Sequence, residues 1–309
     1  MVAAQVVLTS GELVTATDTN EYKDLLRGLR GGGGNFGVVV QWTFQLFDVS
    51  QAFAGTVVHF APTVARVKTV LHNYAKIVED MPDAGSSIIA MPGGAPVFIN
   101  VATMIGGDEV KNAKVYTDIP FLASVSNLGA LFRMSNDLGR KDYIDEIAVI
   151  LEPVQQRCYA SAIGAMVYAF DDAMLDALVH FTRVDLPTGK NTKPIIIVQT
   201  ISGEQRRNDG SLSSLRHRKA VAWVIIEAGY EPHATPEQIQ SVRDWATRAK
   251  QKVIEIGGED GPHNFCDSDG RRIKFFTDEQ RVFLEGAKKK YDPNNLFTLP
   301  DKSIVSHSE

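Results

Sequence analysis

A run of four consecutive glycines near the start of the chain limits its possible structure more than any other feature. Arg30 to Gly37 read RGGGGNFG. Glycine adopts positive φ without a steric penalty and loses much conformational entropy when it is fixed, so such a run is unsuited to the interior of a helix or strand. We therefore expect the run to end the helix predicted over Glu21–Leu29 and to lead into the strand predicted over Val38–Phe47.

The glycine run also matches a nucleotide-binding pattern by spacing alone. Gly32, Gly34 and Gly37 satisfy G-x-G-x-x-G. In that motif the turn leaves a strand and opens a helix, so that free N–H groups and the positive end of the helix face a phosphate. Here the predicted order is reversed, and the negative end of a helix adjoins the run. The run is therefore either a flexible cap and linker or a bare backbone that a flat ring can approach.

Length and composition indicate a globular protein with a large core or two lobes. The chain has 309 residues, 44% of them hydrophobic and 22% charged, and a formal net charge of −5. The sequence has no basic block with interleaved aromatic residues, which argues against nucleic acid as a partner. It has no apolar stretch of roughly 18 residues and no signal-peptide pattern at its start, so we expect a soluble protein without a membrane partner. Cys158 and Cys266 are interpreted as free thiols, with a disulfide as the alternative.

Hydrophobic periodicity predicts an α+β fold in which helices cover one face of an antiparallel sheet. Val6–Leu8 and Leu13–Thr15 are expected to form a hairpin around a glycine turn. Further strands are predicted over residues 57–60, 87–91, 97–104, 194–201 and 220–226, and helices over residues 63–79, 109–117, 171–181, 235–256 and 278–290. Residues 301–309 are expected to be disordered.

Polar residues mark the ends of several predicted helices. Residues 18–20 offer three possible caps for the first helix, and Thr235 with Gln238 forms a capping-box pattern at the start of the longest one. Lys288–Lys290 lie at the carboxyl end of the last helix, where cations interact favourably with the helix dipole. We interpret these lysines as a solvated helix end.

Two distant segments together carry a family resemblance. Leu26 to Val39 resembles the "LxxxLRGGGGNFG" helix and loop of the berberine-bridge-enzyme-like FAD-linked oxidases, which are part of the vanillyl-alcohol-oxidase or PCMH-type flavoprotein superfamily. Lys289 to Phe297 is similar to the closing "KxxYDPxNLF" of that family. Weaker matches lie between them: Leu215 to Arg218 resembles "FxHR", and Asn264 to Asp267 resembles "NYxD".

The resemblance implies how the chain is divided and where FAD would bind. Residues 1–50 would be the carboxyl-terminal part of the FAD-binding domain, residues 51–258 the antiparallel substrate domain, residues 259–300 a segment that returns to the flavin domain, and residues 301–309 a tail. Tyr291 and Asn295 would either bind the flavin or brace the loop beside it. By position, the cofactor-binding residues would be Gly33, Gly34, Asn35, Phe36, Gly37, Asn264, Tyr291 and Asn295.

The resemblance also implies the chemistry. Family members oxidise a small organic substrate by hydride transfer to the flavin while a side chain removes a proton, and dioxygen usually reoxidises the flavin. Ile225 occupies the position at which the family often has a Gln or Glu base. Glu227, which faces the same side of the predicted strand, and His263 are therefore the candidate catalytic residues. His217 is the candidate substrate contact, although a histidine beside arginines is more often structural.

Family members carry a further lobe before the matched part, which grips the FAD pyrophosphate and holds the His and Cys that can tether the ring. We therefore expect an N-terminally truncated member that binds FAD noncovalently. Two alternatives remain open: a flavin-free member that binds or isomerises a small molecule, and an inactive fragment. No metal site is expected, because His263, Cys266, Asp267 and Asp269 lack the spacing of zinc ligands.

Overall fold

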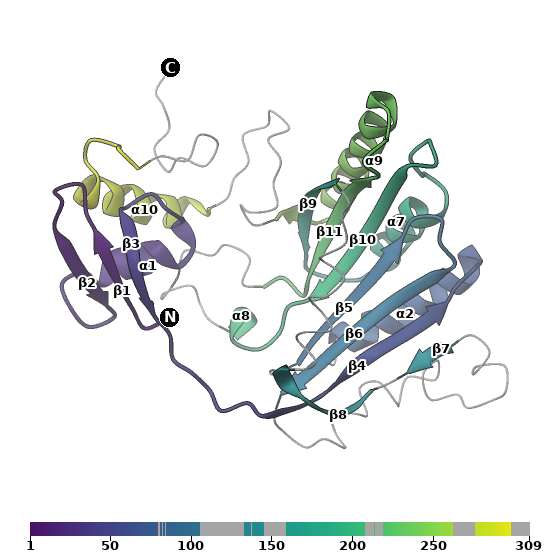
Figure 1. Ribbon diagram of the computed structural model, residues 1–309, viewed down its shortest axis with the longest axis horizontal. Helices are drawn as coiled ribbons and strands as arrows, with labels where there is room; N and C mark the ends of the chain where they lie inside the picture. Colours follow the sequence, from purple (N-terminus) through teal and green to yellow (C-terminus); the bar gives the residue numbers. More distant parts are fainter. Residues whose placement is uncertain are drawn as a thin grey trace. The chain divides into compact units, whose positions relative to one another are not determined.

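A computed structural model describes residues 1–79, 81, 83, 85–105, 133–136, 138–144, 159–207, 213, 219–261 and 276–297. The chain forms two compact units, whose elements are labelled in Figure 1. Unit 1 comprises Met1–Asp48, Arg207–Arg218 and Ser268–Glu309, and unit 2 comprises Val49–Arg206 and Lys219–Asp267, each as far as it is described. Within the described residues, no helix combines the length and apolar character that crossing a membrane requires.

Unit 1 contains a small antiparallel sheet packed against two helices. The strands β1 (Ala3–Val7), β2 (Leu13–Thr17) and β3 (Val38–Thr43) follow the order β2-β1-β3. Helices α1 (Lys23–Gly32) and α10 (Asp278–Tyr291) share one hydrophobic core with this sheet. Segments from both ends of the described chain therefore meet in one cluster, whose fully buried members include Val6, Leu25, Leu26, Phe36 and Leu284.

The start of α1 differs from the prediction. The residue before the helix is Tyr22, and no side chain caps the first turn. Asn20 instead accepts hydrogen bonds from the N–H groups of Thr17 and Tyr22 and donates to the carbonyl oxygen of Thr15. Its amide therefore stabilises the turn between β2 and α1, a local bonding pattern that competes with helix capping. The prediction of a cap at residues 18–20 is wrong for this reason.

Strand β3 is also shorter than predicted. It ends at Thr43 rather than at Phe47, because its neighbour β1 begins at Ala3, and Ala3 is the residue that pairs with Thr43. Among the described strands, none pairs with residues 44–47. Phe44 and Phe47 are accordingly exposed.

Unit 2 is built on a large antiparallel sheet. Its strands follow the order β12-β9-β11-β10-β5-β6-β4-β7, and β8 also pairs with β4. Every pairing within the sheet is antiparallel. The strands are β4 (Gln51–Phe60), β5 (Gly85–Pro92), β6 (Val97–Ile105), β7 (Arg133–Asn136), β8 (Gly139–Asp142), β9 (Tyr159–Val167), β10 (Thr192–Thr200), β11 (Ala222–Tyr230) and β12 (Glu259–Asp260).

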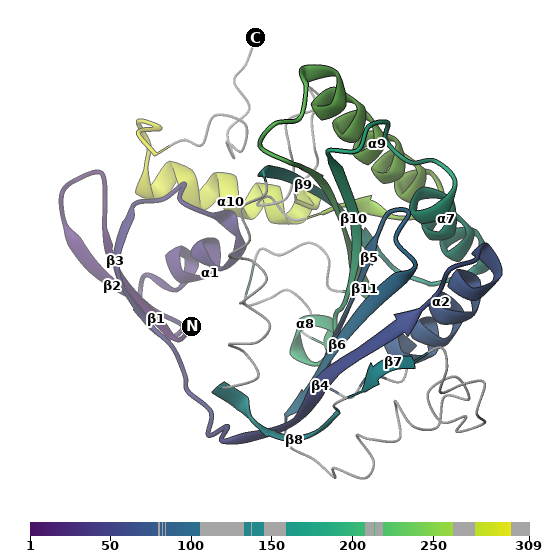
Figure 2. The same ribbon diagram turned by 45° about the vertical axis from the view of Figure 1, so that its right-hand side comes forward.

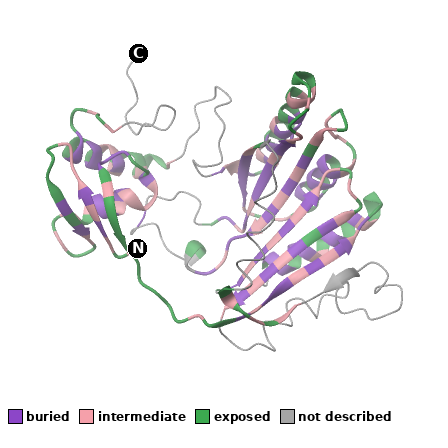
Figure 3. Ribbon diagram, viewed as in Figure 1, coloured by how far each residue is buried: buried purple, intermediate pink, exposed green. Residues whose placement is uncertain are grey.

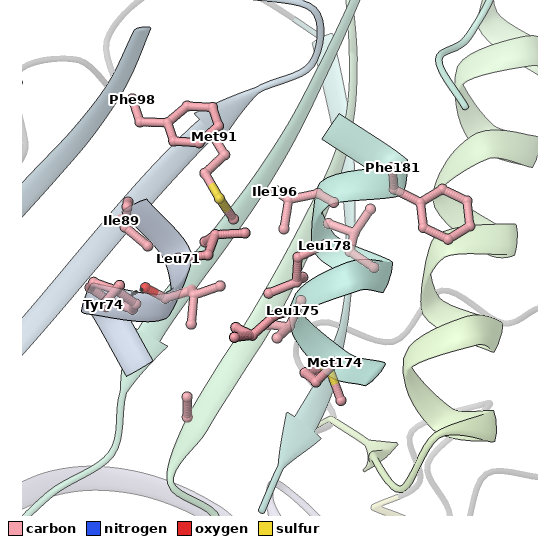
Figure 4. Close-up of a cluster of buried hydrophobic side chains, with 14 of the residues drawn as sticks. Leu71, Tyr74, Ile89, Met91, Phe98, Met174, Leu175, Leu178, Phe181 and Ile196 are labelled. Atoms are coloured by element: carbon pink, nitrogen blue, oxygen red, sulfur yellow. Dashed lines mark hydrogen bonds between the residues drawn. The ribbon is translucent and has the colours of Figure 1, made fainter. Parts of the chain in front are cut away.

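Three long helices cover one face of this sheet, as Figure 2 shows. They are α2 (Val64–Glu79), α7 (Asp172–Arg183) and α9 (Pro236–Glu255), and a short helix α8 (Glu204–Arg207) follows β10. Successive strand residues point to opposite faces, so buried and half-buried residues alternate along the strands (Figure 3). The buried set packs under the helices. In Figure 4, Leu71 and Leu178 from the helices lie near Ile89 and Ile196 from the sheet.

The predicted α+β architecture is confirmed, and so is the capping box at Thr235 and Gln238. Strand β9 was not predicted, although it lies between β11 and β12 in the sheet. Its sequence YASAIGAMV is rich in alanine and glycine, which have low strand propensity. The helix predicted over residues 109–117 and the tail 301–309 lie outside the described residues.

Replacing Leu178 with alanine should destabilise unit 2 by about 2–5 kcal/mol, the usual cost of this change in a packed core. Leu178 is 1% exposed and belongs to the cluster between the helices and the sheet. Leu46→Ala, at a position that is 81% exposed, is the matched control and should leave the free energy of unfolding almost unchanged. Urea denaturation followed by circular dichroism measures both variants. Equal, small effects of the two substitutions would contradict the described core.

Candidate functional site

The glycine run lies where a helix ends and a strand begins, as predicted. The backbone leaves helical geometry at Arg30 and Gly31, and Gly33 has a φ of 69°, a conformation that favours glycine. Gly33 and Gly34 are exposed, and nothing lies within 4 Å of a Cβ atom built on Gly34. Packing therefore does not require glycine at position 34, and the bare backbone there is free to be approached by another group.

Phe36 anchors the run in the core of unit 1. Its side chain is fully buried and lies so close to Gly32 that a Cβ atom there would come within 2.9 Å of the ring. A Cβ atom on Gly37 would approach Val6 Cγ1 and the carbonyl oxygen of Val7 to 2.7 Å. Packing within unit 1 thus fixes two of the predicted cofactor residues, Phe36 and Gly37. Phe36 can offer a ligand its backbone, but not its buried ring.

Asn35 lies beside the exposed glycines and is itself only 2% exposed. Its Nδ2 donates to the carbonyl oxygen of Gly32 at 2.6 Å. Its Oδ1 is buried and has no hydrogen-bond partner within the described part of the chain. A buried acceptor without a donor is unfavourable and is normally satisfied by a ligand, an ion or water. Asn35 is therefore a candidate ligand contact.

A buried lysine joins the glycine run to the carboxyl-terminal loop. Lys288 of α10 is 1% exposed, and its Nζ donates to the carbonyl oxygens of Asn35 and Phe297 at 2.8 and 2.7 Å and to the carboxylate of Asp292. These acceptors match the three donors of an ammonium group. The interpretation of Lys288 as solvated is wrong, because the residue lies one helical turn after the buried Leu284 and shares its core-facing side.

The carboxylate of Asp292 completes this buried network. Its Oδ1 accepts a hydrogen bond from the N–H of Leu296, and its Oδ2 accepts from the N–H of Phe297, both at 2.8 Å, and from Lys288. Burial by itself would raise the pKa of Asp292, but Lys288 and the two N–H groups outweigh it and hold the pKa below its ordinary value. The carboxylate is therefore ionised. Its hydrogen bonds to Leu296 and Phe297 close the loop of residues 292–297.

The loop closed by Asp292 carries the predicted cofactor residue Asn295. Its φ is 51°, a conformation that asparagine adopts more readily than most residues. Its Oδ1 is buried and, like Oδ1 of Asn35, has no hydrogen-bond partner among the described residues. The site thus presents two unsatisfied amide oxygens on two loops that Lys288 holds together.

The hydroxyl group of Tyr291 is engaged within unit 1. The residue is 4% exposed, and its hydroxyl donates to Asp24 Oδ1 at 2.5 Å. Burial and the hydrogen bond to Asp24 raise the pKa of Tyr291 to about 12. The backbone carbonyl of Tyr291 accepts a hydrogen bond from Thr9. Of the two predicted roles, binding the flavin and bracing the loop, this geometry corresponds to bracing.

Glu227 lies on β11 in unit 2, on the sheet face opposite the helices. Its register partners are Ile195 on β10 and Ala162 on β9, and it faces the same side as Ile225, as expected. Its side chain is half-buried, and burial raises its pKa above the ordinary value. No described residue forms a hydrogen bond or ion pair with its carboxylate. A carboxylate in such surroundings can serve as a base or bind a proton donor.

Three predicted site residues, His217, His263 and Asn264, lie outside the described residues and stay predictions. The remaining members of the group tested for zinc spacing, residues 266, 267 and 269, also lie outside them. Among the described residues, no three His, Cys, Asp or Glu side chains gather to hold a metal ion.

Sequence reasoning missed Lys288 and Asp292 as members of the site. Asp292 stood inside the family-like YDPNNLF segment, but no role was given to it. The available signal for Lys288 was its spacing of four residues from both Leu284 and Asp292 on a helical face.

The sequence matches no family model. Over 96% of its length it is 24% identical to an FAD-linked oxidoreductase of Dictyostelium discoideum, 61% of which is covered. A berberine-bridge-enzyme-like protein of Physcomitrella patens has the same fold, with a TM-score of 0.76, 18% identity, and coverage of 99% of this chain and 66% of that protein. Glucooligosaccharide oxidase from Acremonium strictum, a protein with 6-S-cysteinyl, 8α-N1-histidyl FAD, matches with a TM-score of 0.79 and 17% identity over 97% of this chain and 65% of its own.

These likenesses agree with the resemblance seen in the sequence. The fold is that of berberine-bridge-enzyme-like, PCMH-type flavoproteins, and the sequence resembles FAD-linked oxidoreductases along almost its whole length. The chain spans about three fifths of the length of the curated relatives that it matches.

Replacing Lys288 with methionine should destabilise unit 1 by about 3–5 kcal/mol, because it leaves the buried Asp292 carboxylate without its cation. The matched control is Lys289→Met on the exposed side of the same helix, which should change stability by less than about 1 kcal/mol. Denaturant unfolding of each variant measures its change in the free energy of unfolding. A Lys288→Met protein as stable as the control would contradict the buried ion pair.

The pH dependence of stability tests the same pair. The pKa of Asp292 is lower in the folded state than in the unfolded chain, where it is about 3.9. The contribution of Asp292 to the free energy of unfolding should therefore be present above about pH 4, and it should disappear as the pH falls through the pKa of Asp292 in the folded state. The free energy of unfolding of the wild-type protein, measured as a function of pH, should fall in this acid range. The fall should be smaller for Lys288→Met.

Proposed function

We propose that this chain is part of an FAD-linked oxidoreductase, in which unit 1 supplies part of the flavin site and unit 2 binds a small organic substrate. The observation that carries the proposal is the pair of unsatisfied amide oxygens on Asn35 and Asn295. They lie on the two loops that Lys288 joins, next to the bare backbone of Gly33 and Gly34. Both atoms are acceptors, and a flavin offers a ring N–H and ribityl hydroxyl groups as donors. The residues present therefore fit this cofactor.

The proposed division of the chain follows from this assignment. Residues 1–50 and the carboxyl-terminal segment up to residue 300 would contribute to the flavin domain, and the sheet between them would be the substrate domain. We place the return to the flavin domain after β12, because Glu259 and Asp260 pair with β9 in the sheet of unit 2.

Asn35 and Asn295 would hold FAD, which when bound would supply the hydride acceptor for substrate oxidation, with dioxygen as the proposed final electron acceptor. Glu227 would accept the proton that the substrate loses, and its raised pKa makes it a stronger base than an ordinary glutamate. We propose that unit 1 holds FAD by noncovalent contacts, since its described part has no His or Cys side chain to bond to the ring.

Flavin retention tests the proposal directly. The full chain is mixed with excess FAD, free cofactor is removed and the visible spectrum is recorded. A retained, shifted flavin band is expected, and Asn295→Gly should weaken FAD binding roughly three- to tenfold because it removes one hydrogen bond while glycine tolerates the positive φ. Asn294→Gly, at the exposed neighbouring position, is the control. A colourless wild-type protein would refute autonomous flavin binding and favour the flavin-free alternative.

Glu227→Gln should lower the rate of substrate oxidation about 10²- to 10⁴-fold without changing FAD retention, because glutamine keeps the shape but cannot accept the proton. In the wild-type protein, kcat/KM should rise with pH through the pKa of Glu227, which burial places above the ordinary glutamate value. Glu231→Gln is the control, since Glu231 follows the same strand and pairs with Lys193. Peroxide release from a panel of alcohols measures turnover, and an unchanged rate in Glu227→Gln would assign the base to another residue.

A further inference from the structure

Strand β3 lies at an open edge of the small sheet in unit 1. It pairs with β1 on one side, and among the described strands none pairs with its other side. The ladder with β1 shifts register once, between Gln5 and Val6. Five of the six residues of β3 are exposed (Figure 3). The outer edge of such a strand presents N–H and C=O groups with which another strand can pair.

Proteins usually protect an open strand edge with charged residues or proline. The other described edge strands follow this rule. In unit 2, β12 consists of Glu259 and Asp260, and the sequences of β7 and β8 contain arginine. In unit 1, β2 lies between Glu12 and Asp18. Strand β3 lacks this protection, because residues 31–47 include no charged residue and no proline.

The exposed side chains of β3 and of the residues that follow it offer a large apolar area. Trp42, Phe44 and Phe47 are 43%, 59% and 82% exposed. Burying an aromatic side chain removes about 150–250 Å² from water, so these three would remove roughly 300–450 Å² per copy of the chain. A standard interface buries about 800 Å² per partner. The aromatic residues supply about half of that area before the backbone, Val38 and Val40 are counted.

A second copy of the chain is complementary to this edge. Two antiparallel copies of β3 related by a twofold axis pair their open backbone groups, and the contact closes after two chains because both use the same surface. Since neither copy has a charge in residues 31–47, no like charges come to lie opposite each other. The apolar side chains of both copies leave water on contact.

We propose that this chain forms a twofold-symmetric dimer in which β3 pairs with β3 of a second copy. The two three-stranded sheets then join into one continuous antiparallel sheet. This pairing needs no flavin, so its test is separate from that of the proposed function.

Sedimentation velocity of the full chain at micromolar concentration tests the pairing. The wild-type chain should sediment as a species with twice the 33.9 kDa mass of one chain. Val40→Lys should shift this species to the monomer mass, because it places a lysine from each copy on the paired edge. The matched control is Leu13→Lys on β2, at the opposite edge of the same sheet, which should stay dimeric. Leu13 is 56% exposed and Val40 55%.

Amide hydrogen exchange locates the contact. The N–H groups of β3 should exchange several-fold more slowly in the wild-type dimer than in Val40→Lys, whereas those of β2 should exchange alike in both. A monomeric wild-type chain, or open-ended assemblies in place of a dimer, would overturn the proposal. So would a dimer that persists in Val40→Lys, or one that is lost equally in Leu13→Lys. Trp42→Lys replaces Val40→Lys if circular dichroism shows that variant to be unfolded.

Discussion

The buried ammonium group of Lys288 is the interaction on which the candidate flavin site depends. It bonds to Asn35 in the glycine run, to Asp292 at the end of α10 and to Phe297 in the following loop. Removing a cation from water is costly, and the cost is offset here by one carboxylate and two carbonyl oxygens. Residues separated by more than 250 positions in sequence are thereby held around one atom. All of the residues that Lys288 bonds belong to unit 1.

This arrangement explains how a run of glycines can form a defined surface. Glycine has few intrinsic conformational limits, so the path of the run has to be set by its neighbours. Phe36 fixes one side through the core, and Lys288 fixes the carbonyl group of Asn35. Gly33 and Gly34 are exposed, and nothing lies within 4 Å of a Cβ atom built on Gly34. The absence of side chains at these two positions then leaves room for a flat ligand, which larger residues would fill.

The parts of the molecule that followed from local patterns were predicted, and the parts that depend on tertiary contacts were not. Helix α9 has a capping box, a proline in its first turn and a periodic apolar side, and all of these lie within its own sequence. Strand β9 is set by its neighbours, because its alanines and glycine indicate no strand until β11 and β12 pair with it. Lys288 was misread because a lysine beside two exposed lysines gives no local sign of the carboxylate and carbonyl groups that bury it. Glu227 was placed on the correct face because a period of two residues is a local property.

The described carboxyl groups whose pKa is shifted lie in two kinds of environment. Some form ion pairs that lower their pKa, whereas the pKa of Glu227 is raised by burial. Arg30 and Arg248 hold the pKa values of Asp18 and Asp185 below the ordinary range, and Lys288 does so for the buried Asp292. Each of these acids is engaged in an ion pair. Glu227 is the one described acid whose pKa is raised, and burial among aliphatic side chains is the cause. Among the described residues no cation lies beside it, so burial of its ionised form is not offset by an ion pair, which is the environment that motivates the proposal of Glu227 as a base.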